Sequence, residues 1–597
     1  MNPKSKQANF FAAILLIIMF VLAFGSMRDD SAIRDEIPHI VAGYSYLTKQ
    51  DYRLNPEHPP LIKDLAAFPL LFLKPNFPSD HPAWKNEANG QWLLGDVFLY
   101  FSDNDADKMI FFSRLPIVFL AILLGFFVFK WTKELYGPKA GLLALFLYTL
   151  SPNILAHSRF VTMDLGITAF FFISFYCFWK FLKNPSWKTL FIAAFAFALC
   201  QLAKFSGIIL IPIFGLTTFL FSLTSRPLPD IKNTPSRWIR LLKRTSFYIG
   251  CLFLIFIIAY LFVGIFYQFH IANMPLDMGH RLIDESLGDP KYDNVQGILH
   301  KMHNNPILKP YSQYLLGLIM VFAHSTGGHT TYFMGEIGQR WWNYYFVAYL
   351  IKEPIAGQIL LYLACLFFLW KIVKRREKNL KKRISDFLHN NYIQIGIVAF
   401  ITLLLGLAIN SKLQLGIRYI LPIFPFLYML TAGQVMKAQN YIQNKTKYSK
   451  KSLLLISYNL FLVILLIWYG VANLKIYPSY LAYFNELIGG PQKGYKYMVD
   501  SNCDWGQDLK RLAQFVKKNN IDKIKLDYFG GGNPEYYLGE KFVPWGADKG
   551  PTTGWLAVSA SPFQWTSNKP RESSYAWLES YKPVAQIGYS IFVYNIE

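Results

Sequence analysis

The first group of residues with the types needed for acid–base chemistry is Arg34-Asp35-Glu36-Ile37-Pro38-His39. A carboxylate beside an arginine stays ionised, and an ionised carboxylate can take the proton of an attacking hydroxyl group. Asp35 is therefore a candidate general base. The structural alternative is helix capping, since acidic residues before a helix start favour its positive end.

A second group follows at Asn55-Pro56-Glu57-His58-Pro59-Pro60-Leu61, with Lys63 and Asp64 close behind. Glu57 and His58 are candidates for binding a substrate or a metal ion, and Lys63 for binding a phosphate. A rigid proline turn with solvated charges is the alternative. No HxxxH or HExxH spacing supports a metal site, so a divalent metal remains an open alternative with no certain cofactor.

The third group is Ser151-Pro152-Asn153-Ile154-Leu155-Ala156-His157-Ser158-Arg159-Phe160-Val161-Thr162-Met163-Asp164. It lies in a very short predicted loop, which would hold Arg159 and Asp164 near the membrane plane, where the two could also simply pair with each other. A fourth group shares the predicted outer side, where basic side chains suit a lipid phosphate and Arg offers a bidentate fork. Snorkelling toward headgroups is its alternative, and its members are Lys204, His324, His329, Glu336, Arg340 and Arg418.

The elements that must position these groups are predicted membrane spans. The chain has 597 residues, of which 53% are hydrophobic and only 16% charged, and a span needs roughly 20 mostly apolar residues. Two shorter runs, 61–73 and 311–323, indicate interfacial or re-entrant helices. Eleven runs are long enough to predict spans: 10–27, 110–130, 140–156, 163–182, 187–203, 206–224, 246–268, 355–372, 391–410, 417–437 and 452–474.

The net charge of +23 would suit a nucleic-acid partner, but its distribution argues against one. Lys and Arg concentrate in alternate loops, at 225–245, 371–390 and 437–451, as the positive-inside rule expects of cytoplasmic loops. The N-terminus is then cytoplasmic, and the large loops 28–108 and 269–354 face outward. An odd number of spans also places the C-terminal residues outside.

Residues 477–597 are predicted to form a small extracytoplasmic α/β domain, after a membrane domain over 1–476. Residues 505–519 have the pattern of an amphipathic helix. The segments 523–529, 555–560 and 584–594 have the pattern of strands. The polar stretch Asp500-Ser501-Asn502-Cys503-Asp504-Trp505-Gly506-Gln507-Asp508 either starts the helix, with Asp504 as N-cap, or covers a site; we favour the helix start.

In several stretches the sequence resembles the GT-C superfamily of membrane glycosyltransferases. The nearest resemblance is to the bacterial branch of the dolichyl-phosphate-mannose protein mannosyltransferase family, and a more distant one is to the lipid A aminoarabinose transferases. The ordered set is more specific than any single member, and its stretches are RDEIPHIVAGYSYL, DYRLNPEHPPLIKDLAAFPLL, SPNILAHSRFVTMDL, YFMGEIGQRWWNYYFVAYLIKEP, GIRYILPIFPFLY and SNCDWGQDL.

The resemblance implies a GT-C fold and a role for several of these residues. Asp35 matches the acidic catalytic position, with Glu36 beside it, and Asp164 matches an acidic position in the second outer loop. Glu57 and His58 match a Glu-basic-Pro pattern, although His replaces the Lys of the aminoarabinose branch. The basic residues expected to bind the donor phosphate are Lys63, Arg159, Lys204 and Arg418.

The resemblance also implies a reaction. It is an inverting transfer of a sugar from a polyprenyl-phosphate carrier to a hydroxyl acceptor, which is a protein, a lipid or a cell-envelope glycan, at the outer face of the cytoplasmic (inner) membrane. The expected partners are the lipid-linked sugar and membrane lipid, with no nucleic acid. The alternative is a transporter or flippase of lipid-linked sugars, which would place polar sites near the membrane midplane.

Overall fold

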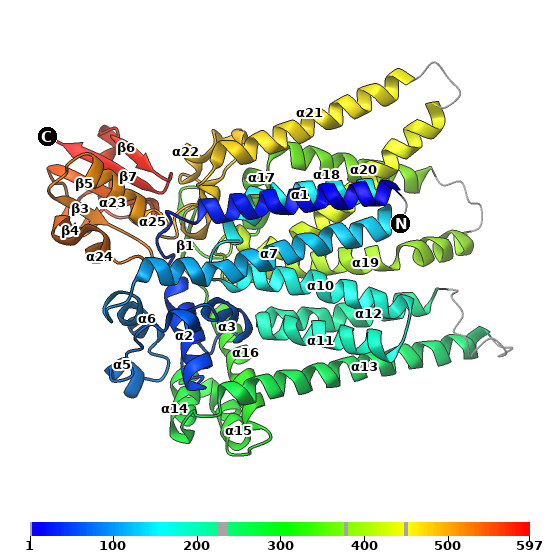
Figure 1. Cartoon of the computed structure of the whole chain (residues 1–597), viewed down its shortest axis with the longest axis horizontal. Helices are drawn as coiled ribbons and strands as arrows, with labels where there is room; N and C mark the ends of the chain where they lie inside the picture. Colours follow the sequence, from blue (N-terminus) through cyan, green and yellow to red (C-terminus); the bar gives the residue numbers. More distant parts are fainter. Residues whose placement is uncertain (1–2, 225–236, 375–379, 447–451) are drawn as a thin grey trace.

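A computed structural model describes residues 3–224, 237–374, 380–446 and 452–597 as a long helical bundle with a small sheet at one end (Figure 1). In this described part, nine helices are long and apolar enough to cross a membrane. Their elements are α1 (Pro3–Ser26), α7 (Ala106–Tyr136), α10 (Met163–Lys183), η1 (Phe205–Ile209) continued by α12 (Leu210–Ser222), α13 (Arg237–His270), α18 (Ile355–Val373), α19 (Leu380–Asn410), η4 (Ile417–Ile423) continued by α20 (Phe424–Thr446), and α21 (Ser452–Ile476).

Two of the eleven predicted spans are not among these nine long helices. The run 140–156 is not one helix, because it breaks into α8 (Pro138–Thr149) and α9 (Pro152–His157). The Ser151 side chain accepts the Ile154 N–H at 3.3 Å, which starts a new helix there. The run 187–203 forms α11 (Trp187–Ala203), which is 17 residues long. Both α8 and α11 nevertheless pack within the bundle, α8 against α7 and α20, and α11 against α10 and α13.

The two large loops fold into short helices at the end of the bundle that carries the sheet (Figure 1). The first loop forms α2 (Glu36–Lys49), α3 (Leu61–Ala67), α4 (Leu70–Leu73), α5 (Pro82–Lys85) and α6 (Gln91–Tyr100). The second forms α14 (Leu276–Ser286), η3 (Pro290–Tyr292), α15 (Asp293–His303), α16 (Lys309–Gly327), the hairpin β1 (Thr331–Phe333) and β2 (Glu336–Gly338), and α17 (Tyr344–Lys352). The short run 311–323 is thus the middle of the 19-residue helix α16.

The C-terminal part contains a five-stranded sheet in the order β4-β3-β5-β7-β6. Strand β3 pairs parallel with β4 and β5, whereas β7 pairs antiparallel with β5 and β6. The predicted strand 584–594 is in fact a hairpin. The elements are α23 (Leu509–Lys518), β3 (Ile524–Asp527), α24 (Pro534–Leu538), β4 (Phe542–Pro544), β5 (Gly554–Ser559), α25 (Ala560–Trp565), β6 (Ala585–Ile587) and β7 (Ile591–Ile596).

This sheet region is bonded to the first loop through the polypeptide backbone. The Arg34 N–H donates to the Trp505 carbonyl at 3.1 Å, and the Gly531 N–H donates to the Ala32 carbonyl at 3.2 Å. A Cβ at Gly531 would lie 2.3 Å from the Ile33 carbonyl oxygen, so only glycine permits this approach. The first loop and the C-terminal part of the chain are therefore joined by backbone hydrogen bonds.

The opposite end of the bundle carries the basic residues that flank the predicted cytoplasmic loops. Parts of those loops lie outside the described residues, at 225–236, 375–379 and 447–451. The described basic residues near them, at the ends of α13, α18 and α20, are Arg240, Lys243, Arg244, Lys371, Lys374, Lys437 and Lys445. Their position at the end away from the sheet (Figure 1) is consistent with the charge pattern in the sequence.

Candidate active site

Arg418 lies at the centre of a charged cluster at the sheet-bearing end of the bundle. Its Nη1 atom is 2.8 Å from Asp35 Oδ2 and 3.6 Å from Asp164 Oδ2. Arg418 follows Gly416, which has a φ of +104° and lets the chain turn into η4. The next N–H, that of Ile417, donates to Asn502 Oδ1 at 3.1 Å, so the C-terminal part fixes this turn.

Asp164 holds a second cation beside the first. The Lys204 Nζ donates to Asp164 Oδ1 at 2.8 Å, so the carboxylate of Asp164 faces Lys204 and Arg418 together. Asp164 lies in the first turn of α10, where the helix dipole favours a negative charge. Lys204 lies between α11 and η1 and keeps one fifth of its side chain exposed.

Asp35 is the most exposed carboxylate of this cluster. It occupies the N-cap position of α2, but its side chain makes no capping hydrogen bond. Asp35 thus lies at the helix start that the capping alternative requires, but its carboxylate pairs with Arg418. With 28% of its side chain exposed, Asp35 remains accessible to a ligand.

The stretch 500–508, which we predicted to start a helix, supplies part of the cluster. Helix α23 begins only at Leu509, and the ring centre of Trp505 lies 4.2 Å from the Arg418 guanidinium. Asp500 is buried with a φ of +56°. The pKa of Asp500 is raised overall, mainly because the side chain is buried. The positive charge of Arg418 lowers this pKa, and the negative charge of Asp35 raises it. The signals for this stretch in the sequence were its density of polar residues and its place in the family resemblance, as SNCDWGQDL.

Glu36 points away from this cluster into the protein. Its carboxylate accepts two hydrogen bonds from Arg114, at 2.8 and 2.6 Å, and one from the Val161 N–H at 3.0 Å. It also accepts the Ile33 N–H at 3.0 Å. Both oxygens are occupied and the side chain is fully buried, an arrangement that joins the first loop to α7 rather than one that exchanges protons.

Arg159 and Lys63 are also engaged elsewhere. Arg159 pairs with Asp30 at 2.9 Å, not with Asp164, so the predicted alternative pair does not form. Lys63 donates to the Tyr46 hydroxyl at 2.8 Å and to the carbonyls of Asn55 and His58 at 2.8 and 2.7 Å. Burial lowers the pKa of Lys63 to about 7. Lys63 therefore holds the proline-rich turn in place.

His58 and Glu57 lie on that turn at the edge of the cluster. The rings of His39 and His58 are 5.5 Å apart, and burial lowers the pKa values of both, so both are neutral at pH 7. His58 Nδ1 and Glu57 Oε2 are buried without a hydrogen-bond partner. Glu57 accepts a hydrogen bond from Gln91 at 2.8 Å through its other oxygen.

His329 and Glu336 do not join Glu57 and His58 in a metal site. His329 is exposed, and exposed Glu336 accepts a hydrogen bond from the Trp341 indole at 3.2 Å. Within the ranges that the structure describes, no group of three or more His, Cys, Asp or Glu side chains is arranged to hold a metal ion. We therefore derive no chemical step through a metal.

The fold and the cluster define a class: a multi-pass helical membrane protein whose charged site lies at one end of the bundle. Within this class, residues 90–260 match the family model described as dolichyl-phosphate-mannose-protein mannosyltransferase. The match supports the predicted resemblance to GT-C membrane glycosyltransferases. No curated protein matches the chain in sequence.

Solved structures similar to the chain are distant from it in sequence. ArnT from Cupriavidus metallidurans, bound to undecaprenyl phosphate, is 11% identical over 99% of this chain and 98% of its own, with a TM-score of 0.40. The Archaeoglobus fulgidus oligosaccharyltransferase is 11% identical over 90% and 64%, with a TM-score of 0.47. The S. cerevisiae protein O-mannosyltransferase Pmt1-Pmt2 complex, bound to its sugar donor, is 15% identical over 46% and 35%, with a TM-score of 0.34.

Proposed function

We propose that the protein transfers a sugar, with inversion, from a polyprenyl-phosphate carrier to a hydroxyl acceptor at the outer face of the cytoplasmic membrane. The observation that supports this proposal is the cluster in which Arg418 bridges a partly exposed carboxylate, Asp35, and a buried one, Asp164. An accessible base beside fixed cations is what transfer from a phosphate leaving group needs.

In the proposed step, the acceptor oxygen attacks C1 of the sugar while its proton passes to the Asp35 carboxylate. The bond between C1 and the phosphate oxygen breaks, and its electron pair leaves with the lipid phosphate. Arg418 and Lys204 stabilise the charge that develops on the phosphate. Asp164 acts as a positioning residue, since both cations are bound to its carboxylate.

The pairing of Asp35 with Arg418 implies an order of events. Without donor, the 2.8 Å ion pair occupies both the base and the cation. The donor phosphate carries a negative charge and competes with Asp35 for the guanidinium. Donor binding thus frees the carboxylate for the acceptor, so the base becomes available only when there is a sugar to transfer.

The orientation in the membrane is part of this proposal. The basic ends of α13, α18 and α20 suit the cytoplasmic side, so the cluster and the C-terminal sheet would face outward. The membrane-edge position of Lys204 and Arg418, at the starts of η1 and η4, suits a phosphate attached to a lipid tail. The proposed acceptor is a hydroxyl group of a protein, a lipid or a glycan.

The test is transfer from a polyprenyl-phosphate sugar by purified protein carrying Asp35→Asn. We expect kcat to fall by about 10²–10⁴-fold, since that is the usual contribution of a general base. Asp29→Asn is the matched control, because Asp29 is exposed on the same loop and should leave kcat unchanged. Activity of D35N near that of the control would remove Asp35 from the base role, and the absence of any transfer by the unaltered protein would favour a transporter.

A further inference from the structure

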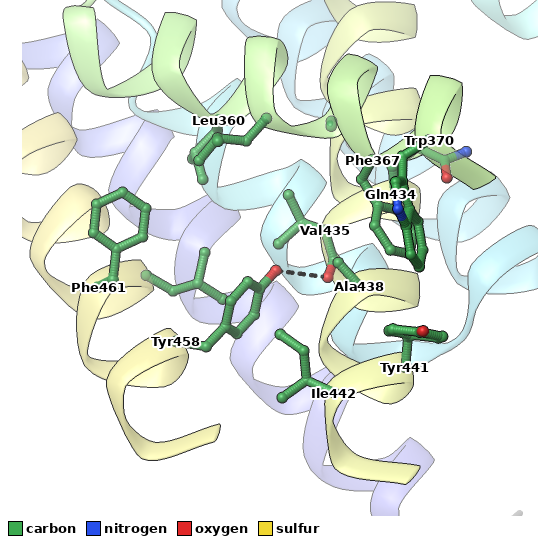
Figure 2. A pocket seen from close by; sticks show the side chains of 13 residues that line it. Leu360, Phe367, Trp370, Gln434, Val435, Ala438, Tyr441, Ile442, Tyr458 and Phe461 are labelled. Atoms are coloured by element: carbon green, nitrogen blue, oxygen red, sulfur yellow. Dashed lines mark hydrogen bonds between the residues drawn. The ribbon is translucent and has the colours of Figure 1, made fainter. Parts of the chain in front are cut away.

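An apolar groove of about 420 Å³ lies between α18, α20 and α21 (Figure 2). The Tyr458 hydroxyl of α21 donates to the Val435 carbonyl of α20 at 2.9 Å and crosses the groove. The small side chains of Ala364 and Ala438 leave room for the groove. Leu360 and Phe461 also line it. All three helices are predicted spans, so the groove opens to the hydrocarbon of the membrane.

The groove belongs to the half of the bundle remote from the charged cluster. The α20 residues that line it, Gln434 to Ile442, follow Phe424 by ten to eighteen positions. At 1.5 Å per residue this is about 15–27 Å along the helix. A lipid seated here has its headgroup at the basic end of the bundle, so it is distinct from a donor whose phosphate contacts Arg418.

Four described lysines carry positive charge at the basic end of the groove. Lys374 Nζ donates to the Tyr441 hydroxyl at 3.4 Å, and Lys445 Nζ lies 5.1 Å from the same ring. Lys371 and Lys437 lie on the same helices. Among the residues that the structure describes, no carboxylate forms an ion pair with any of these four lysines.

We propose that this groove binds an anionic phospholipid of the adjacent leaflet. One acyl chain lies along Ala364 and Ala438, and the phosphate lies between Lys374 and Lys445 beside the Tyr441 hydroxyl. Basic pockets between spanning helices recognise anionic headgroups in this way. The apolar lining alone would accept any lipid chain, so the lysine pair supplies the preference for negative charge.

The test is native mass spectrometry of the detergent-purified full chain with phosphatidylglycerol or phosphatidylcholine at equal concentration. We expect one phosphatidylglycerol to be retained in preference to phosphatidylcholine. Each lysine near an anionic surface contributes about fivefold in affinity, so Lys374→Gln with Lys445→Gln should weaken binding by about 25-fold. Ala438→Trp should abolish the retained lipid by filling the groove.

The matched control is Arg240→Gln with Lys243→Gln, which removes the same charge from the same end of the bundle on α13, away from the groove. It should retain the lipid. Equal retention of phosphatidylcholine, or loss of phosphatidylglycerol in the control as much as in the lysine variant, would overturn the proposal. So would a lipid that survives in both the lysine variant and A438W. Sugar transfer is not part of the readout, so the result is independent of the proposed reaction.

Discussion

At the scale of residues, the guanidinium of Arg418 carries more of the candidate site than any other group. It pairs with Asp35 and Asp164 and lies 4.2 Å from the centre of the Trp505 ring. A planar guanidinium lies flat on an aromatic face and offers a rigid fork to two oxygens of one group, a geometry that a lysine ammonium does not reproduce. The identity of this residue as Arg, and not its charge alone, should therefore matter.

Arg418→Lys tests this point. The variant keeps the charge but loses the fork and the stacking, so we expect kcat/KM for the lipid-linked donor to fall by about 10–150-fold, the equivalent of a charge-assisted hydrogen bond. The measurement is initial-rate kinetics with varied donor. Arg281→Lys is the control, since Arg281 is exposed on α14. It pairs with Glu285 and donates to the Asn86 carbonyl. Equal kinetics in both variants would move phosphate binding away from Arg418.

The residue types in the candidate site could be predicted from the sequence, but their pairings could not. Asp35, Asp164, Lys204 and Arg418 were selected as ionisable residues at a membrane edge, and these four do converge. Hydropathy and spacing are local properties, whereas the partner of a buried charge is set by contacts across hundreds of residues. The sequence therefore could not show that Arg159 is neutralised by Asp30.

At the scale of elements, one buried carboxyl group connects several helices. Glu353 lies between α17 and α18, and its carboxyl group is 3.2 Å from the Tyr428 hydroxyl of α20 and 3.4 Å from the Tyr469 hydroxyl of α21. Asn153 of α9 is 3.5 Å away. Burial raises the pKa of Glu353 from 4.5 to about 8, so this group is mostly protonated in the folded protein at neutral pH.

This raised pKa predicts a pH-dependent stability. Above about pH 4.5 the unfolded chain ionises Glu353 while the folded chain does not, so stability falls as the pH rises toward about 8. The Glu353→Gln side chain is uncharged at every pH, like protonated Glu353. The variant therefore lacks this loss of stability as the pH rises. We expect the Tm of the variant, relative to the unaltered protein, to increase between pH 5 and pH 8 in thermal unfolding. Parallel Tm curves over that range would contradict the prediction.

The long helices were easier to predict from the sequence than the breaks between them. Apolar runs near 20 residues predicted α7, α10 and α13, because a helix that crosses the hydrocarbon needs about that many apolar residues. The helices α7 and α13 extend beyond these runs, to 31 and 34 residues. The break at Ser151-Pro152 was missed, since a buried helix start inside an apolar run has no hydropathy signal. A tight turn was missed as well: the segment 584–594, predicted as one strand, contains the turn between β6 and β7, at Gly588 with a φ of +56°.

At the scale of the whole molecule, the proposed orientation assigns the two ends of the bundle to different compartments. Lys188, exposed near the start of α11, lies at the basic end, and Lys582, exposed in the C-terminal sheet region, lies at the other. In a chain without its native cysteines, Lys582→Cys should react with a membrane-impermeant thiol reagent in intact cells whose outer barrier is permeable. Lys188→Cys should react only after lysis.

The pair of positions is its own control, because both residues are exposed lysines and differ only in the end of the bundle they occupy. Labelling of Lys188→Cys and protection of Lys582→Cys in intact cells would reverse the topology. Comparable labelling of both would show that the reagent had crossed the membrane, and repeating the assay with a larger reagent would then separate the two ends.

The stacking of Trp505 on Arg418 has a consequence for biosynthesis. Asp35 belongs to the first outer segment made by the ribosome, and Trp505 to the last. A nascent chain whose spanning helices are already inserted still lacks the Trp505 ring that packs on Arg418. The complete cluster can therefore assemble only after residues 500–508 have been synthesised.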